Sequence, residues 1–551
     1  MESKKLECEV ITPMFCYGTN KNSPELRPAS LKGLMRNTFR IIQQEMLEPE
    51  KEESVALLAK ENHLFGDAKE NPSPLRFAFD EEKIKPGKKK FLFHGKEKHN
   101  RPMQYISPGS EFSIQISLRK NAMEKLKHQM KLGDCPLTWY AKLIEISLIL
   151  GSLGGRNRKG RGRVYVKLQN EKLSERNVQN HILQYLNDLA FFGKYECKDG
   201  IITPTGKIGR YVNRPVIEKI EFGKLIYKKD GWDQDFLKHI DSASHEVQKI
   251  FGDKKYTTGL ANPRFASSIN VGVVEVEEGF LPIYTHIKPV LIKRKRNEEK
   301  KEGYFERDAF VKLIEQKGGN RYSVQLREDK GCDFGKPDSM LKVIKLPDKK
   351  KKISFKINEQ ATCDFKLYER TKPLAKSYSD GKPIHVKYEP LGKLAIGIGE
   401  ESPYDTTLLM TLHPLYGIPY IPATVIKGML SHYWHQEVND EESVLQELFG
   451  NANQQGKLTF FDIFPKQYTL NFDVMTPYYS DYYQGNAPPT DDQNPIPITF
   501  PCVENAIFNV YIAYQEAGIL VKYKVEEELG KAFKHYGIGA KTALGYGISK
   551  S

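Results

Sequence analysis

An internal repeat constrains the fold of this 551-residue chain more than any other feature. The first copy starts at residues 27–33 (Arg-Pro-Ala-Ser-Leu-Lys-Gly), and the second starts at residues 421–428 (Ile-Pro-Ala-Thr-Val-Ile-Lys-Gly). Both continue through a helical segment to a Leu-Phe-Gly triplet and then into a Phe-rich extended stretch. Both end with an apolar helix-like segment, a glycine-rich loop and a last strand. The ordered matches indicate two copies of one fold.

The strand and helix signals in each copy predict an α+β module. Leu6, Cys8 and Val10 alternate with charged residues before the first helix, and residues 407–412 read as a buried strand before the second. The order strand, helix, two strands, helix, glycine loop and strand is typical of a ferredoxin-like module with an antiparallel sheet. Helices at 178–192 and 234–251 and a hairpin across 277–279 predict a further sheet-containing module between the copies.

We therefore expect several ferredoxin-like modules in one chain. The predicted divisions are a first module at 1–170, a second ferredoxin-like module at 171–295, a basic linker or insertion at 296–389, and a C-terminal module at 390–551.

The charge balance favours a polyanionic partner. Lys and Arg total 84 against 70 Asp and Glu, which gives a net charge of +14. No stretch approaches about 18 consecutive apolar residues and the N-terminus lacks a signal-peptide core, so we expect a cytoplasmic protein without a membrane partner. The seven cysteines are scattered without a Cys-x-x-Cys pair, which favours reduced core thiols.

Two elements of the first copy concentrate cations. Lys32, Arg36 and Arg40 recur at i, i+4 and i+8 and line one face of the predicted helix beside its apolar face. The glycine-rich loop at 151–163 then carries five more cations: Arg156, Arg158, Lys159, Arg161 and Arg163. Glycines let the backbone approach a ligand and cations neutralise phosphates, so binding of a phosphate backbone is favoured over a merely tight turn.

The second copy keeps this scaffold but loses most of the charge. Lys427 is the cation that remains at the matching positions of its helix, and its glycine loop at 537–547 contains Lys541 and Tyr546. A structural turn and a binding loop are about equally compatible with this second loop. The Tyr-rich segment 472–485 is compatible with base stacking, a protein interface or loop packing.

The sequence contains few motifs that indicate catalysis or metal binding. The sequence contains no His-Glu-x-x-His and no Gly-x-Ser-x-Gly, and no cofactor or metal is expected. His413 and His535 could each act as a general base on a ribose hydroxyl, although a packing role is the more common one for an isolated histidine.

These landmarks resemble the RAMP superfamily of CRISPR-associated proteins. Residues 1 to about 295 are similar to the first subunit of type III-B Cmr effector complexes. The segments that carry this similarity are 11–15 (Ile-Thr-Pro-Met-Phe), 25–33, the Arg-rich glycine loop and 263–268. Residues 390–551 are similar to the sixth subunit, on 413–422, 473–477 and 537–543. The resemblance is that of a natural fusion of two neighbouring subunits, and about 100 residues between the matched parts stay outside it.

The resemblance implies RRM-like ferredoxin modules and a non-catalytic subunit that helps to hold the 3′ region of CRISPR RNA and to capture target RNA. The implied partners are CRISPR RNA, target RNA and other Cmr-type subunits. A metal-independent endoribonuclease using His413 or His535 and a structural adaptor without RNA contact are the alternatives. The residues that we expect to contact RNA are Lys32, Arg36, Arg40, Arg156, Arg158, Lys159, Arg161, Arg163, Lys427, Lys541 and Tyr546.

Overall fold

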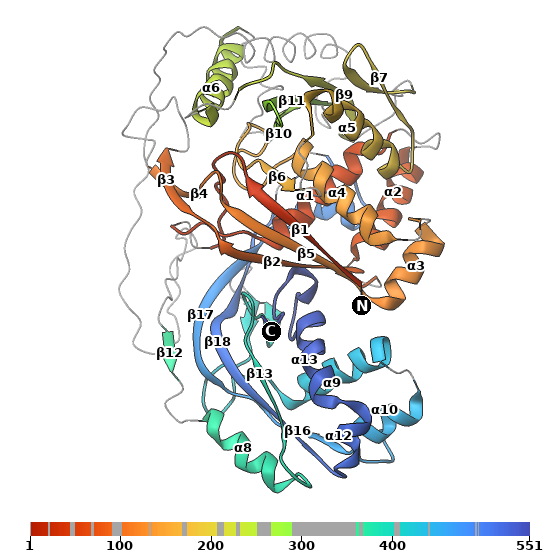
Figure 1. The fold of residues 1–551 in the computed structure, drawn as a ribbon, viewed down its shortest axis with the longest axis vertical. Helices are drawn as coiled ribbons and strands as arrows, with labels where there is room; N and C mark the ends of the chain where they lie inside the picture. The colour runs from red at the N-terminus through yellow and green to blue at the C-terminus, as the bar shows by residue number, and fades with distance from the viewer. Residues whose placement is uncertain are drawn as a thin grey trace.

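A computed structural model shows two lobes that meet along one junction (Figure 1). The N-terminal half comprises the described residues up to 288, and the C-terminal half comprises those from 360 onward. The residues that the structure describes are 2–19, 22–44, 50–67, 71–90, 102–130, 132–133, 135–167, 173–206, 214–227, 232–250, 266–288, 360–362, 367–401, 408–438, 441–490, 493 and 495–550.

The first module contains the predicted ferredoxin-like sheet. Its four strands lie in the order β2-β5-β1-β6 and all neighbours are antiparallel. In the chain, α1 follows β1, and α4 lies between β5 and β6. Its elements are β1 (Glu2–Val10), α1 (Pro28–Ile42), α2 (Glu50–Phe65), β2 (Leu75–Lys83), β3 (Pro86–Lys90), β4 (Pro102–Ile106), β5 (Glu111–Leu118), α3 (Lys120–Met130), α4 (Pro136–Leu150) and β6 (Val164–Lys167).

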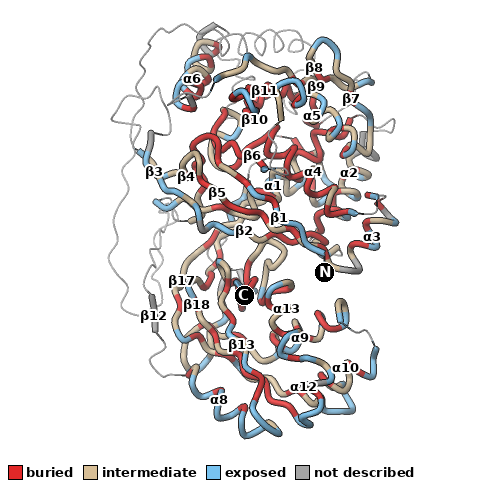
Figure 2. Tube along the Cα trace, in the orientation of Figure 1, coloured by how far each residue is buried: buried red, intermediate tan, exposed pale blue. Residues whose placement is uncertain are grey.

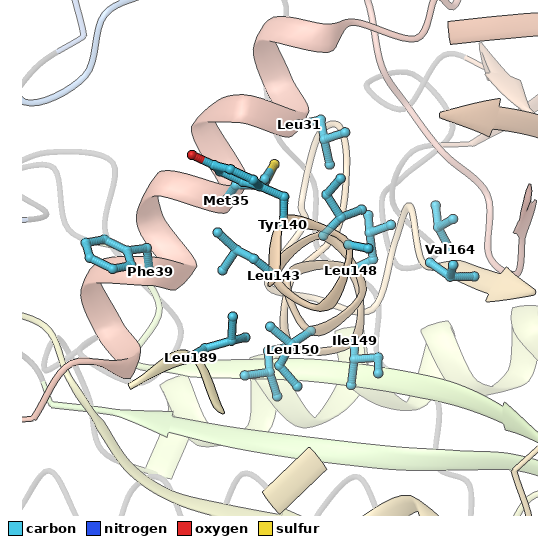
Figure 3. Packing of buried hydrophobic residues seen from close by; sticks show 14 of the residues in the cluster. Leu31, Met35, Phe39, Tyr140, Leu143, Leu148, Ile149, Leu150, Val164 and Leu189 are labelled. Atoms are coloured by element: carbon cyan, nitrogen blue, oxygen red, sulfur yellow. The ribbon is translucent and has the colours of Figure 1, made fainter. Parts of the chain in front are cut away.

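Helix α4 lies at the centre of the N-terminal half. It is apolar on nearly all sides, as a helix surrounded by other elements must be. Leu143 faces Met35 and Phe39 of α1, Leu148 lies on the side of Val164, and Leu150 lies near Leu189 of the next module (Figure 3). One core therefore continues from the first module into the second.

The second module is a five-stranded antiparallel sheet in the order β10-β11-β9-β8-β7. The predicted hairpin is confirmed, and its strands β10 and β11 are buried along their whole length. Helix α5 belongs to the core shared with α4, whereas α6 covers the opposite face, so this module departs from a ferredoxin-like arrangement. Its elements are α5 (Glu175–Leu189), β7 (Tyr195–Lys198), β8 (Ile201–Pro204), β9 (Ile217–Phe222), α6 (Trp232–Ile250), β10 (Ile269–Val276) and β11 (Gly279–Ile287).

The C-terminal half repeats the ferredoxin-like order with a shortened last strand. Strands β17, β18 and β13 are neighbours, and a bridge between Pro390 and Ser549 stands where the fourth strand would pair. Its elements are β12 (Gln360–Thr362), α8 (Leu367–Ser377), β13 (Ile384–Tyr388), β14 (Ile398–Glu401), β15 (Leu408–Met410), α9 (Ala423–Tyr433), η2 (Trp434–Val438), α10 (Glu442–Phe449), β16 (Leu458–Phe460), β17 (Pro465–Met475), α11 (Ser480–Tyr483), β18 (Ile498–Tyr514), α12 (Gly518–Tyr523), α13 (Val525–His535) and η3 (Thr542–Leu544).

One expectation about this half was met only in part. The strand expected at 407–412 is present as β15, but it pairs with β14 in a separate two-stranded sheet and does not take the place of β1. The strand that corresponds to β1 is β13, which pairs with β18. The sequence of β13 is less apolar than 407–412, which explains why the sequence pattern favoured the other strand. The basic runs at 293–296 and 349–352 lie outside the described residues.

Burial follows this division of the chain (Figure 2). Buried segments concentrate in α1, α4 and the strands, while α8 is largely exposed on the outer face of the C-terminal sheet. The cysteines were expected to be core thiols. Cys8, Cys16 and Cys502 are buried and free, whereas free Cys135 is exposed and free Cys197 is half-buried. In the described part of the chain, no helix is long and apolar enough to cross a membrane.

Candidate nucleic-acid interface

The first glycine loop turns the chain tightly from α4 to β6. Gly154, Gly160 and Gly162 all have positive φ, and a Cβ on Gly162 would lie 1.9 Å from the carbonyl oxygen of Leu153. The second loop repeats this geometry, since a Cβ on Gly547 would lie 1.9 Å from the carbonyl oxygen of Ile538. Both loops thus need their glycines for backbone conformation, whatever else they bind.

Two of the five cations in the first loop lie in the protein interior. Arg161 is fully buried and forms a two-point ion pair with Asp241 of α6, with nitrogen–oxygen distances of 2.7 and 3.2 Å. Arg163 is equally buried and donates to backbone carbonyls, among them that of Asn157 at 3.0 Å. Burial lowers the pKa of Arg163 to about 9. Both side chains hold modules together, and in this conformation neither can reach RNA.

The other three cations of this loop are partly buried against the second module. Arg156 contacts Asp241 at 3.0 Å, Lys159 donates to the Ser244 hydroxyl at 3.0 Å, and Arg158 donates to a backbone carbonyl at 2.6 Å. The carbonyl acceptor of Arg158 belongs to Ser267. Helix α6 therefore covers part of the predicted phosphate-binding loop. RNA contact by Arg156, Arg158 and Lys159 stays a prediction.

The basic stripe of α1 faces the Tyr-rich segment of the C-terminal half. Arg40 lies over the ring of Tyr479, 4.6 Å from its centroid, and Arg36 lies 5.1 Å from the centroid of Tyr483. The basic stripe, which was expected to bind RNA, thus contacts the Tyr-rich segment of the same chain. Of the three roles left open for this segment, the structure shows packing within the chain.

Glu61 of α2 is the carboxylate that makes this contact stable. Its side chain is fully buried, and it pairs with Arg40 at 2.9 Å and Arg36 at 3.2 Å. The hydroxyls of Tyr482 and Tyr483 both donate to it at 3.1 Å. We call these five residues the Glu61 cluster. A buried carboxylate with two guanidiniums and two hydroxyls has its charge and its hydrogen-bonding capacity well satisfied.

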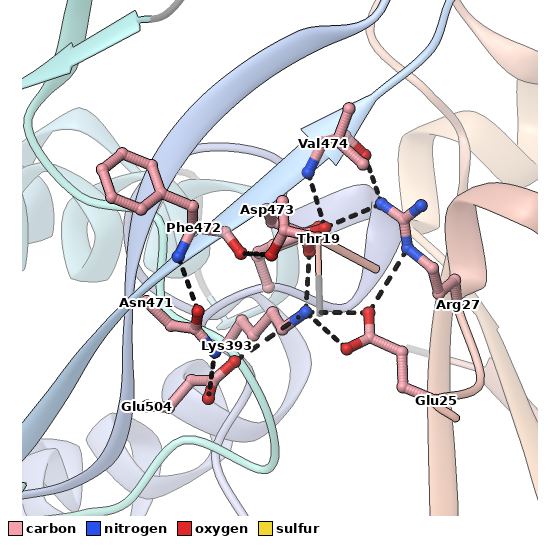
Figure 4. Close-up of polar contacts among 10 residues, drawn as sticks. Thr19, Glu25, Arg27, Lys393, Asn471, Phe472, Asp473, Val474 and Glu504 are labelled. Carbon is pink, nitrogen blue, oxygen red and sulfur yellow. Dashed lines mark hydrogen bonds and ion pairs between the residues drawn. The ribbon is translucent and has the colours of Figure 1, made fainter. Parts of the chain in front are cut away.

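A second cluster, in which half-buried Lys393 lies beside buried Asp473, is at the same junction (Figure 4). Lys393 binds Glu25 at 2.8 Å and Asp473 at 3.1 Å, and Arg27 binds Asp473 at 2.8 Å. Burial alone would lower the pKa of Lys393, but Asp473 and Glu25 raise it above its usual value. Tyr546, a predicted RNA contact, donates to Asp473 at 2.5 Å. Sequence analysis did not predict this cluster. Glu25, Arg27 and Asp473 lie in the segments 25–33 and 473–477 that carry the family resemblance, but no pattern pairs them, and Lys393 lies in no motif.

The remaining predicted residues differ in their surroundings. Lys541 lies 4.8 Å from the ring centroid of Phe500, and burial lowers its pKa. Lys427 is exposed on α9. Lys32 donates to the Ser73 hydroxyl at 2.9 Å, and burial followed by the charge of Arg36 lowers the pKa of Lys32 to about 7.

The two histidines considered as general bases occupy different aromatic surroundings. His413 stacks on Tyr416 at 4.8 Å and meets the edges of Tyr420 and Phe464. His535 ends α13, and burial lowers its pKa. No described contact joins His413 to His535. Nor do the described residues contain a group of three or more His, Cys, Asp or Glu that could hold a metal ion.

Comparison with known proteins assigns the family. The RAMP superfamily model matches residues 7–165 and 383–549, which together make up more than half of the chain and coincide with its two ferredoxin-like modules. The chain belongs to the RAMP superfamily. The predicted family and the α+β fold with antiparallel sheets are confirmed.

The more particular similarity is to Cmr6 proteins. The chain is 27% identical over 264 residues to the CRISPR system Cmr subunit Cmr6 of Pyrococcus furiosus, covering 35% of this chain and 76% of that protein. It is 26% identical over 211 residues to Cmr6 of Saccharolobus solfataricus, covering 38% of this chain and 63% of that protein, less than two thirds of its length. A matching solved structure is apo Cmr1 from P. furiosus, at 16% identity and a TM-score of 0.31, covering 54% of this chain and 92% of that one.

The Glu61 cluster predicts a large loss of stability on neutralising its carboxylate. In Glu61→Gln the buried guanidiniums of Arg36 and Arg40 lose their counter-charge, which costs about 3–5 kcal/mol for a broken buried ion pair. We expect a clearly lower midpoint in thermal and urea unfolding of the full chain. The matched control is Glu369→Gln on exposed α8, which should leave both midpoints almost unchanged. Equal stability of the two variants would contradict the assigned role of Glu61.

The low pKa of Lys32 predicts a pH dependence of stability. The unfolded chain binds the Lys32 proton up to a pH of about 10.4, whereas the folded chain releases it near pH 7, so this residue makes stability rise with pH across that window. Replacing Lys32 by Met should therefore reduce the gain in melting temperature between pH 7 and pH 9. The comparison is with wild type and with Lys372→Met, an exposed lysine on α8. An identical pH profile for Lys32→Met and wild type would show that Lys32 keeps its proton in the folded state.

Proposed function

We propose that this chain is an RNA-binding subunit of a type III-B CRISPR effector complex. The observation that carries the proposal is the match of the RAMP model to both ferredoxin-like modules, together with the similarity of the chain to proteins named as Cmr6 subunits. Its partners would be CRISPR RNA, target RNA and other subunits of that complex. The net charge of +14 supports a polyanionic partner.

The two halves act as one body in this proposal. Contacts that cross the junction fix the relative orientation of the halves: Tyr482 donates to Glu61, Arg27 pairs with Asp473, and Lys393 pairs with Glu25. Two RNA-facing surfaces held in this way can contact a single strand with little further ordering, which favours binding. The junction would thus do within one chain what an interface between two subunits does in a multi-chain complex.

A non-catalytic role is part of the proposal. The ring of His413 is surrounded by three aromatic rings, which is the environment of a packing residue. His535 packs at the junction, where its backbone carbonyl accepts a hydrogen bond from Arg76. Metal-independent cleavage of ribose phosphates needs a base aligned on the 2′-hydroxyl and a group that protonates the leaving oxygen.

RNA contact is expected to depend on the cations that are at least partly exposed. We expect the full chain to bind single-stranded RNA with an affinity that falls as salt rises, because phosphate contacts release counterions. Lys427→Gln and the double variant Arg158→Gln/Lys159→Gln should each weaken binding and lower the salt slope by about 0.7 per lost contact. Filter binding at several salt concentrations measures both quantities.

The control for these variants is Lys372→Gln, which removes one positive charge from exposed α8. It should leave the affinity and the slope as in wild type. If all variants bind RNA with the affinity and slope of wild type, the chain is an adaptor without direct RNA contact at these residues.

The endoribonuclease alternative makes a different prediction. Incubation of the purified chain with CRISPR repeat RNA in EDTA should leave the RNA intact, as judged on a denaturing gel. Specific cleavage that disappears in His535→Ala or His413→Ala would overturn the non-catalytic proposal and identify the base. Cleavage that survives both replacements would come from elsewhere.

A further inference from the structure

A third cluster at the junction carries positive charge that no carboxylate pairs. Arg76 of β2 and Arg119, which follows β5, both lie over the ring of Tyr536, at 4.3 and 5.4 Å from its centroid. In the register of β2 and β5, Arg76 lies opposite Ser117, so Arg76 and Arg119 share the sheet face that is turned toward the C-terminal half. The exposed His432 ring lies 5.6 Å from Tyr536. We call these four residues the Tyr536 cluster.

Internal contacts account for only part of this charge. Arg76 donates to the carbonyl of His535, where α13 ends, and this contact compensates some of its charge. Glu437, the acceptor of the Tyr536 hydroxyl at 3.0 Å, supplies one negative charge nearby. Yet no ion pair joins Arg76 or Arg119 to a carboxylate in the described part of the chain. The cluster thus holds two guanidiniums against one carboxylate that neither of them contacts.

The hydrogen-bonding capacity of the two arginines is also incomplete. Arg76 is only 3% exposed, and the Nε atoms of both arginines are buried without a hydrogen-bond partner among the described residues. A buried donor left unpaired destabilises the folded chain, and it does so more strongly when it is charged. Burial, followed by repulsion from Arg119, lowers the pKa of Arg76 to about 9, so Arg76 still carries its charge at neutral pH.

Solvent reaches this cluster at the exposed His432 ring and at Arg119, which is half-buried. A cavity of about 390 Å³ adjoins the cluster and is lined by Tyr433, Glu437, Val438, Glu528, Lys531 and His535. Two of these lining residues contact the cluster, because Glu437 accepts from the Tyr536 hydroxyl and the His535 carbonyl accepts from Arg76. The other carboxylate of the cavity, Glu528, is already engaged by Lys531 and by the Tyr433 hydroxyl, both at 2.8 Å.

We propose that the Tyr536 cluster is a phosphate-binding site formed jointly by the two halves of the chain. Arg76 and Arg119 supply guanidinium donors from the N-terminal half, and His432 supplies a ring N–H from the C-terminal half. A planar guanidinium matches two oxygens of a phosphate, and one anion satisfies the charge and the free donors together. The ligand is a phosphate group, either one of an RNA backbone or one of a free phosphate compound.

Inorganic phosphate is the probe for this site. Thermal unfolding of the full chain, with chloride replaced by phosphate at constant ionic strength, should show a concentration-dependent rise in melting temperature that follows binding to the folded state. Arg119→Gln should abolish most of this rise, and Arg119→Lys should weaken phosphate binding about tenfold, because it keeps the charge but loses the paired donors. Arg370→Gln on exposed α8 is the matched control and should respond as wild type does.

General salt effects on the hydrophobic core act on all these variants alike. The difference between their melting-temperature rises therefore measures phosphate binding at the site. An equal phosphate response in wild type, Arg119→Gln and Arg119→Lys overturns the proposal. Line broadening of the phosphate ³¹P signal by the wild-type chain, absent with Arg119→Lys, provides a second readout that does not depend on melting.

RNA binding distinguishes the two sources of phosphate. If the site takes an RNA backbone phosphate, Arg119→Gln lowers RNA affinity and reduces the salt slope by about 0.7. If it takes a free phosphate compound, RNA affinity is unchanged while the phosphate response is lost. Both outcomes support the site. Because the phosphate arm uses no RNA, a chain that fails to bind RNA at all would contradict the proposed function and leave the phosphate result standing.

Discussion

The buried charges at the junction are the constraint on which the rest of this structure depends. Glu61 is fully buried between two guanidiniums that lie against tyrosine rings of the other half, and Asp473 lies between Lys393 and Arg27 in the same way. Isolated charges of this kind could not stay in the protein interior. Each half therefore needs the other, since removing the Tyr-rich segment would expose Glu61 and its guanidiniums, and removing residues 25–27 would take Glu25 from Lys393 and Arg27 from Asp473.

Duplication of the ferredoxin-like module gave the two copies the same backbone and different contacts. The two glycine loops share one backbone feature. Gly162 and Gly547 each lie close to the carbonyl oxygen of a residue that precedes them in the chain. The residue before each of these glycines differs, being Arg161 in one copy and Tyr546 in the other. Both nevertheless bind an aspartate from another element, Asp241 or Asp473. The residue before this glycine thus anchors the loop to another element in both copies. The anchor is an ion pair in the first copy and a hydrogen bond from a neutral hydroxyl in the second.

Much of the fold could be predicted from the sequence because its signals are local. The apolar spacing of α1, the continuous apolar run of α4 and the glycines of both loops each act within a few residues. The fate of the cations could not be predicted in this way. Arg40 and Arg161 read as exposed binding residues until Glu61 and Asp241 are brought beside them, and those carboxylates lie 21 and 80 positions away. Charge partners over such separations are set by packing and not by a sequence period.

The Tyr536 cluster differs from the other two clusters because, among the described residues, its arginines have no carboxylate partner. At the Glu61 and Lys393 clusters, each buried cation has a carboxylate, so these contacts are complete without a ligand. The Tyr536 cluster lies at the same junction and joins the same two halves, but its arginines have no such partner in the described chain. An anion bound there would contact both halves at once, and by linkage it would stabilise their association by as much as the association strengthens its binding. Of the three clusters, this is therefore the one through which a ligand can act on the junction.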